Sequence, residues 1–179
     1  MKPVKVQGVT YYSIPIKHIK RDLPALLPLA RPGYVKNVTL HWTAGGYSTG
    51  YRAYQVLIGP ETILVSASLL AFFRHQHTFR RNTHNIGVCF MAMAGATERN
   101  AGRFPVTARM VETASLVVGM LQKKYSLGKS QVVDHAHFAH IDGYRSWRWD
   151  IRFPWAPGEN MMDVVRRKAW WYREKLRQA

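Results

Sequence analysis

Apolar and polar positions alternate along residues 36–42. Val38, Leu40 and Trp42 share one side, and the odd-numbered side chains, which end with His41, take the other. A period of two is typical of a strand that buries one face. We therefore expect a strand that ends at a histidine on its polar face.

Three further segments have the pattern of strands. Residues 54–58 and 62–66 flank a glycine-proline turn and predict a hairpin. Residues 85–93 form a nearly continuous apolar run, which is typical of a central strand buried on both faces. Residues 131–134 predict a short strand that enters a histidine-rich loop.

Two segments have the period of an amphipathic helix. Along residues 107–125 the apolar side chains recur at spacings of three and four, and Gly128 is placed to end that helix. The same pattern predicts a last helix over residues 161–177. The basic residues expected to project outward from it are Arg166, Arg173 and Arg177. Strands mixed with helices on one chain predict a single α/β or α+β domain.

Composition limits the classes of protein. The chain has 179 residues, of which 47% are hydrophobic, so it can bury a core and is not a disordered chain. Its 26 Lys and Arg against 10 Asp and Glu give a net charge of +16. Such an excess indicates a polyanionic partner: nucleic acid, anionic lipid or a bacterial envelope. The single cysteine, Cys89, excludes an internal disulfide and a multi-cysteine metal cluster.

No targeting or membrane-spanning segment is expected. The longest apolar region, residues 54–73, is interrupted by Gly59, Pro60 and Glu61, and the basic start lacks a cleavable apolar stretch. We therefore expect synthesis in the cytoplasm.

The candidate chemistry lies in histidines and one carboxylate. His41 ends its strand beside small residues that leave room, and residues 134–142 contain three histidines directly after a strand. Asp150 lies between aromatic residues. Each signal alone has an ordinary explanation: a strand-edge histidine, a polar loop, or a carboxylate paired with Arg148 or Arg152.

Taken in order along residues 35–153, these segments resemble the zinc-dependent N-acetylmuramoyl-L-alanine amidases of the phage-lysozyme and peptidoglycan-recognition-protein type. Val-Thr-Leu-His41-Trp-Thr-Ala-Gly resembles the strand of the first zinc ligand. Tyr54-Gln-Val-Leu-Ile-Gly resembles the tyrosine-histidine strand, with Gln55 in place of the usual histidine.

The later motifs continue the resemblance. His77-Thr and the run Asn82-Thr-His-Asn-Ile-Gly-Val-Cys are similar to the substrate-groove segment and central strand of the family. His135 matches the second zinc histidine, and Arg148-Trp-Asp150 matches the basic residue and the third ligand.

The resemblance implies the fold, the site and the reaction. It implies an α/β domain over residues 35–156 with a central mixed β-sheet flanked by helices. Outside the resemblance, the residue pattern predicts an extended lead-in over residues 1–34 and a basic amphipathic helix, packed on the same domain, over residues 157–179. Zn²⁺ would be held by His41, His135 and Asp150. The implied catalytic residues are Tyr54 and Arg148, and the implied substrate-binding residues are His77, Asn82 and Asn85.

The residue types suit this reaction. Two neutral imidazoles and one carboxylate leave the fourth tetrahedral position of zinc for water. Zinc lowers the pKa of that water from 15.7 to about 7, so hydroxide is available to attack the amide between muramic acid and L-alanine.

Three classes of function remain at this point. We favour an amidase over a non-catalytic peptidoglycan-binding module, because a pure binder needs no open metal site. A nucleic-acid-binding protein is the third class, but the chain has no helix-turn-helix, zinc-finger or RNP pattern. The expected protein is a monomeric phage or prophage endolysin, made in the host cytoplasm and acting on the wall after membrane permeabilisation. A cytoplasmic or separately exported bacterial amidase is the alternative. Its basic surface would contact the anionic envelope.

Overall fold

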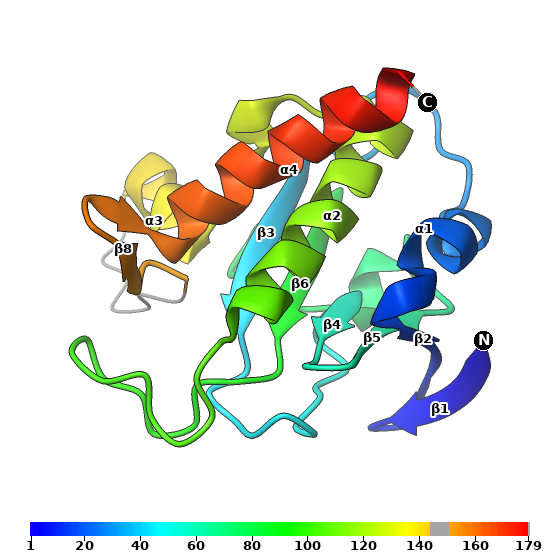
Figure 1. The fold of residues 1–179 in the computed structure, drawn as a ribbon. Coiled ribbons are helices and arrows are strands. Elements are labelled where there is room, and N and C mark those ends of the chain that lie inside the picture. Colours follow the sequence, from blue (N-terminus) through cyan, green and yellow to red (C-terminus); the bar gives the residue numbers. More distant parts are fainter. Residues whose placement is uncertain (144–150, 179) are drawn as a thin grey trace.

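A seven-stranded mixed sheet forms the centre of the chain. The computed structural model describes residues 1–143 and 151–178 (Figure 1). The strands of the sheet, in chain order, are β1 (Lys2–Val6), β2 (Val9–Pro15), β3 (Asn37–Trp42), β4 (Val56–Ile58), β5 (Thr62–Ser66), β6 (Asn85–Phe90) and β7 (Val132–Val133). Their order across the sheet is β1-β2-β5-β4-β6-β3-β7. Strands β4, β6, β3 and β7 are parallel, and the other pairings are antiparallel, so the predicted α/β domain with a mixed sheet is confirmed.

Helices pack against this sheet and connect its strands (Figure 1). The α-helices among the described residues are α1 (Ile19–Asp22), α2 (Ala108–Tyr125), α3 (His135–Asp142) and α4 (Met161–Gln178). The 3₁₀ turns are η1 (Ile16–His18), η2 (Leu23–Leu26), η3 (Phe72–Arg74) and η4 (Lys129–Gln131). Strands β8 (Pro154–Ala156) and β9 (Glu159–Asn160) form a separate ribbon before α4. Figure 1 shows α2 lying over β3 and β6, with α4 alongside it.

The long helix α2 begins and ends where the sequence predicts, but Gly128 is not the residue that ends it. The Thr107 side chain caps it by accepting a hydrogen bond from the Met110 N–H at 3.2 Å. The C-cap is Ser126, in a left-handed conformation with φ of 56°, and not Gly128. Gly128 instead has φ of −80° and precedes η4. Thus the backbone reverses at the first residue after the helix, and no glycine is needed there.

Strand β3 differs from its predicted single buried face. From Val38 to Trp42 every residue is buried, because β3 lies inside the sheet between β6 and β7. Val38, Leu40 and Trp42 pack in the core that includes α2. The opposite face carries His41, whose ring contacts the side chains of Tyr54, His77 and His135.

The first 34 residues are more regular than the predicted lead-in. Strands β1 and β2 form a hairpin, and β2 pairs with β5, so this segment extends the same sheet. Ile14, Ile19 and Leu23 are fully buried in the main core. The prolines are compatible with strands because Pro3 lies on the edge strand and Pro15 ends β2.

Helix α4 packs its apolar stripe on the domain as predicted, but its arginines do not all project outward. The Arg166 guanidinium donates two hydrogen bonds to the Val132 carbonyl oxygen, at 3.1 and 2.9 Å. The Arg173 side chain is 15% exposed and lies over the Trp170 ring. Arg177 is 59% exposed. The prediction is therefore wrong for Arg166 and Arg173, because their long stems let the charged ends fold back onto the protein.

None of the helices in the described part of the chain combines the length and hydropathy needed to cross a membrane.

Candidate functional site

Four aromatic side chains meet on the sheet face opposite α2. The ring centroid of His41 lies 4.4 Å from that of His135, 4.9 Å from that of His77 and 5.0 Å from that of Tyr54. All four residues are buried. The four residues are far apart in the sequence and were predicted as site residues on separate motifs, and they form one cluster around His41.

The sheet register brings the two predicted zinc histidines together. Thr39 of β3 is paired with Val133 of the parallel strand β7. His41 and His135 each follow two residues later, so they leave the same edge of the sheet side by side. His135 is the first residue of α3, which replaces the loop predicted here.

A glycine makes room for the third imidazole. His77 comes from the loop after η3 and packs against Gly87 of β6. A Cβ atom at Gly87 would lie 2.8 Å from His77 Cγ, so a larger side chain there would displace the ring.

Hydrogen bonds fix which ring nitrogens carry protons. The carbonyl oxygen of Asn85 lies 3.2 Å from His77 Nε2, so Nε2–H donates and Nδ1 accepts. That Nδ1 lies 3.0 Å from His41 Nε2 and 2.9 Å from the Thr78 hydroxyl. His135 Nε2 lies 2.8 Å from the His77 carbonyl oxygen and therefore donates to it. His135 therefore carries its lone pair on Nδ1. When His41 Nε2–H donates to His77, the lone pair of His41 is also on Nδ1.

The centre of the cluster disfavours positive charge. Burial, and then the neighbouring imidazole of His41, hold the pKa of His77 well below its ordinary value. His77 is therefore a neutral imidazole near pH 7: its Nδ1 accepts hydrogen bonds, but the ring is not protonated to the cation. A neutral imidazole is also the form in which histidine binds metals.

Asn82 and Asn85 lie behind the histidines and hold the loop that carries them. Asn82 Oδ1 accepts hydrogen bonds from the backbone N–H groups of His77 and Thr78, at 2.8 and 2.7 Å. Asn85 is 1% exposed, and its Oδ1 accepts from the Thr39 hydroxyl at 2.7 Å. These bonds give both asparagines a structural role, and their contact with substrate stays a prediction.

Gln55 also belongs to this scaffold. Its Oε1 accepts from the Gly87 N–H at 2.7 Å, and its Nε2 donates to the Asn85 carbonyl oxygen at 3.2 Å. The amide therefore joins the start of β4 to β6 under the cluster.

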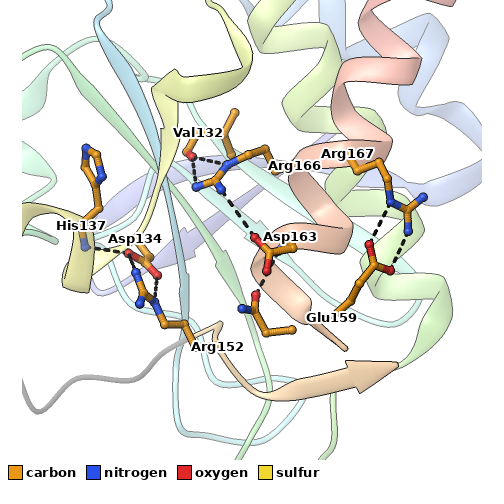
Figure 2. A network of polar contacts seen from close by, with 9 residues as sticks. Val132, Asp134, His137, Arg152, Glu159, Asp163, Arg166 and Arg167 are labelled. Atoms are coloured by element: carbon orange, nitrogen blue, oxygen red, sulfur yellow. Dashed lines mark hydrogen bonds and ion pairs between the residues drawn. The ribbon is translucent and has the colours of Figure 1, made fainter. Parts of the chain in front are cut away.

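A buried carboxylate that sequence reasoning missed positions His135. Asp134 is 2% exposed and caps α3 by accepting a hydrogen bond from the His137 N–H at 2.8 Å. Arg152 donates to the same carboxylate at 2.5 and 3.1 Å, and Figure 2 shows the pair beside the start of α3. The hydrogen bond that Arg152 donates to Asp134 raises the pKa of Arg152, so the guanidinium stays charged. An aspartate directly before a helix is the N-cap signal that could have revealed it.

Two predicted residues, Arg148 and Asp150, lie outside the described residues. Among the residues that are described, no group of three His, Cys, Asp or Glu side chains is arranged to hold a metal ion. The described part of the chain therefore offers the predicted pair of imidazoles, and the third ligand remains a prediction.

The donor set of this pair fits zinc. His135 presents a lone pair on one ring nitrogen while its other nitrogen donates to a carbonyl oxygen, which is how metal-bound histidines are usually oriented. Imidazole is one of the ligand types that zinc prefers.

The comparisons with known proteins leave the family open. No family model matches the chain, and no curated protein or solved structure matches it.

Proposed function

We propose that the protein is a zinc-dependent N-acetylmuramoyl-L-alanine amidase that cleaves peptidoglycan. The observation that carries the proposal is the pairing of His41 and His135 at 4.4 Å between ring centroids, beside Tyr54. The amidase resemblance assigns a ligand role to both histidines and a catalytic role to the tyrosine. The mixed sheet with helices agrees with the fold that this resemblance implies.

In this proposal His41 and His135 hold Zn²⁺ together with Asp150. The bound ion supplies a water of lowered pKa as the nucleophile. Arg152, two positions after Asp150, is bonded to Asp134, the residue directly before His135. This pair ties the chain after Asp150 to the start of the helix that carries the second histidine.

The remaining side chains of the site orient the two zinc histidines or stabilise the negative charge that develops during the reaction. His77 supports His41 through the 3.0 Å contact between their ring nitrogens and supports His135 through its carbonyl oxygen. The Tyr54 hydroxyl would donate a hydrogen bond to the oxygen on which negative charge develops as the amide carbonyl is attacked, with Arg148 as a second donor. The apolar surroundings strengthen such bonds because they exclude water.

The decisive experiment measures metal and product on the same preparations. The purified protein should contain zinc, and His41→Ala should lose both the zinc and the activity. Digestion of peptidoglycan should release new N-terminal alanine without new reducing sugar ends. New reducing ends would identify a glycosidase, and wall binding without cleavage by zinc-loaded protein would identify a recognition module. Either result would overturn the proposal.

The proposal includes attachment to the anionic envelope, as expected of a phage or prophage endolysin that reaches the wall after membrane permeabilisation. The exposed end of α4 offers Arg177 and Lys175, and the Lys175 ammonium lies over the ring of Trp171, which is 55% exposed. Attachment through exposed charges weakens as salt rises. Wall binding of a Lys175→Gln/Arg177→Gln variant should therefore be lower at low salt and less sensitive to salt. Unchanged binding would exclude this end of the helix.

A further inference from the structure

A groove is lined by Tyr54 and by the turn of the N-terminal hairpin. Its volume is about 680 Å³. The residues of its lining on which the argument depends are Gln7, Tyr51, Arg52, Tyr54, Phe73 and Arg74. The hairpin turn at Gln7 lies outside the region of the amidase resemblance, so the sequence motifs assigned it no role.

Hydrogen bonds between segments hold the walls of the groove in place. The Arg52 N–H donates to Gln7 Oε1 at 3.1 Å, which ties the hairpin turn to the loop before β4. His75 Nδ1–H donates to the Arg52 carbonyl oxygen at 2.7 Å, which ties the same loop to the segment after η3. The Tyr11 hydroxyl donates to the Tyr54 carbonyl oxygen at 2.5 Å. A groove whose walls are fixed in advance loses little entropy when it binds a ligand.

The charge of the groove selects the ligand. None of the described residues that line it is acidic, whereas Arg52 and Arg74 are both exposed at its surface. Neither arginine forms an ion pair within the described part of the chain, unlike Arg152 or Arg167. Two guanidinium groups without a carboxylate favour an anionic ligand, and guanidinium is well suited to carboxylates.

Aromatic surface accompanies the charge. The Phe73 side chain is 74% exposed, and the Arg74 guanidinium lies 5.5 Å from the centre of its ring. Tyr51 is 38% exposed. A ligand that suits this lining therefore combines carboxylates with apolar groups, as a short peptide does.

We infer that this groove binds the carboxylate-bearing stem peptide of the substrate, on the side of the scissile amide that leaves as the peptide. The inference rests on the proposed function. In a muramoyl peptide the lactyl carboxyl is consumed in the amide bond, so the free carboxylates lie on the peptide. The two arginines therefore distinguish the peptide from the uncharged sugars of the glycan.

The test measures equilibrium binding, separately from cleavage. A free stem peptide that begins with L-alanine, and the same peptide with its carboxylates converted to carboxamides, are titrated into the zinc-loaded protein by calorimetry. The protein should bind the carboxylate form about 10- to 100-fold more tightly, as hydrogen bonds to charged groups predict. An Arg52→Gln/Arg74→Gln variant should lose most of this difference.

A matched control is Arg103→Gln. Arg103 is exposed and lies over the Phe104 ring at 5.9 Å, as Arg74 lies over Phe73, but it does not line the groove. This variant should bind both peptides as the unaltered protein does. The comparison of two peptides on the unaltered protein does not depend on the folding of any variant.

The outcomes separate the two proposals. Equal binding of the two peptides, or a preference that survives loss of both arginines, overturns the groove inference even where the amide is cleaved. Arginine-dependent binding without cleavage overturns the amidase proposal and leaves the carboxylate site in place.

Discussion

The Nε2 atom of His135 lies 2.8 Å from the backbone carbonyl oxygen of His77, although 58 positions separate the two residues. A carbonyl oxygen only accepts, so His135 carries its proton on Nε2 and its lone pair on Nδ1. The loop that carries His77 therefore decides which atom of His135 is able to bind a metal ion.

This relationship predicts different effects for two substitutions of His135. An asparagine amide reaches about as far as Nδ1, whereas a glutamine amide reaches about as far as Nε2. His135→Asn keeps a ligand atom and loses the bond to His77, so zinc affinity should fall about 10- to 100-fold. His135→Gln should lose more. Competition with a chelator measures the zinc affinity of both variants. A tighter affinity in His135→Gln than in His135→Asn would show that Nε2 is the ligand.

Tyr54 provides a test of catalysis that leaves the metal site intact. Tyr54→Phe keeps the ring that packs 5.0 Å from His41 and removes the hydroxyl. If the hydroxyl stabilises the developing oxyanion, kcat should fall by about 10²–10³ with unchanged zinc content. Tyr47→Phe is the control, since the Tyr47 hydroxyl donates to the Pro105 carbonyl oxygen elsewhere. A Tyr54→Phe enzyme of full activity would remove the residue from the mechanism.

The ion pair of Asp134 and Arg152 should contribute to stability. Asp134→Asn keeps an acceptor for the helix cap but removes the charge that faces the guanidinium. We expect the free energy of unfolding to fall by about 1–3 kcal/mol in urea titrations, since Asp134 is buried and Arg152 is half exposed. Glu61→Gln breaks the exposed pair with Arg109 and should change stability by less than about 1 kcal/mol. Similar losses in both variants would contradict this view of the buried pair.

The crossing of α2 and α4 depends on Gly119. A Cβ atom there would lie 2.7 Å from the Ala169 carbonyl oxygen. Helix propensity alone favours alanine over glycine by about 1 kcal/mol. A net loss of stability in Gly119→Ala would therefore come from the packing of α2 against α4. Gly119→Ala should destabilise the protein by about 1–3 kcal/mol in thermal or urea unfolding. In the control Gly128→Ala the nearest atom to the new Cβ is 3.5 Å away, and stability should stay nearly constant.

The same helix pair predicts a pH dependence through Glu112. Partial burial raises the pKa of the Glu112 carboxyl, but the hydrogen bonds from Lys168 and Tyr172 outweigh it, and the pKa ends below its ordinary value. Stability from a lowered pKa is present above the value in the unfolded chain, and it is lost as pH falls through the value in the folded protein. The unaltered protein should therefore have a higher free energy of unfolding than Glu112→Gln near neutral pH, and this difference should vanish in acid.

This contribution should be small. The Glu112 side chain is 45% exposed, so we expect about 0.5–1 kcal/mol at neutral pH, measured by urea titrations across the acid range. Lys168→Gln should remove part of the same pH dependence, because it removes one of the two donors. A difference between the unaltered protein and Glu112→Gln that grows as pH falls would have the wrong sign and would refute the assignment.

Local patterns were sufficient for the regular elements with strong periods. The 3,4 spacing over residues 107–125 corresponds to α2, and the apolar run from Asn85 corresponds to β6. The sequence predicts these elements because the regular geometry of a helix or strand brings apolar residues to the core at a fixed spacing. The N-terminal strands were harder, since prolines obscured an alternation that only pairing with β5 stabilises.

The sequence by itself determined the residue types of the candidate site: histidines at strand ends, a tyrosine before a hairpin and an excess of cations. Only the tertiary structure decided that His77 supports both His41 and His135, that Asp134 is paired with Arg152, and that Arg166 is turned inward. The reason is physical. Hydrogen bonding and burial depend on which segments meet across the parallel strands β3, β6 and β7, and the sequence pattern of one segment holds no information about its neighbours in space.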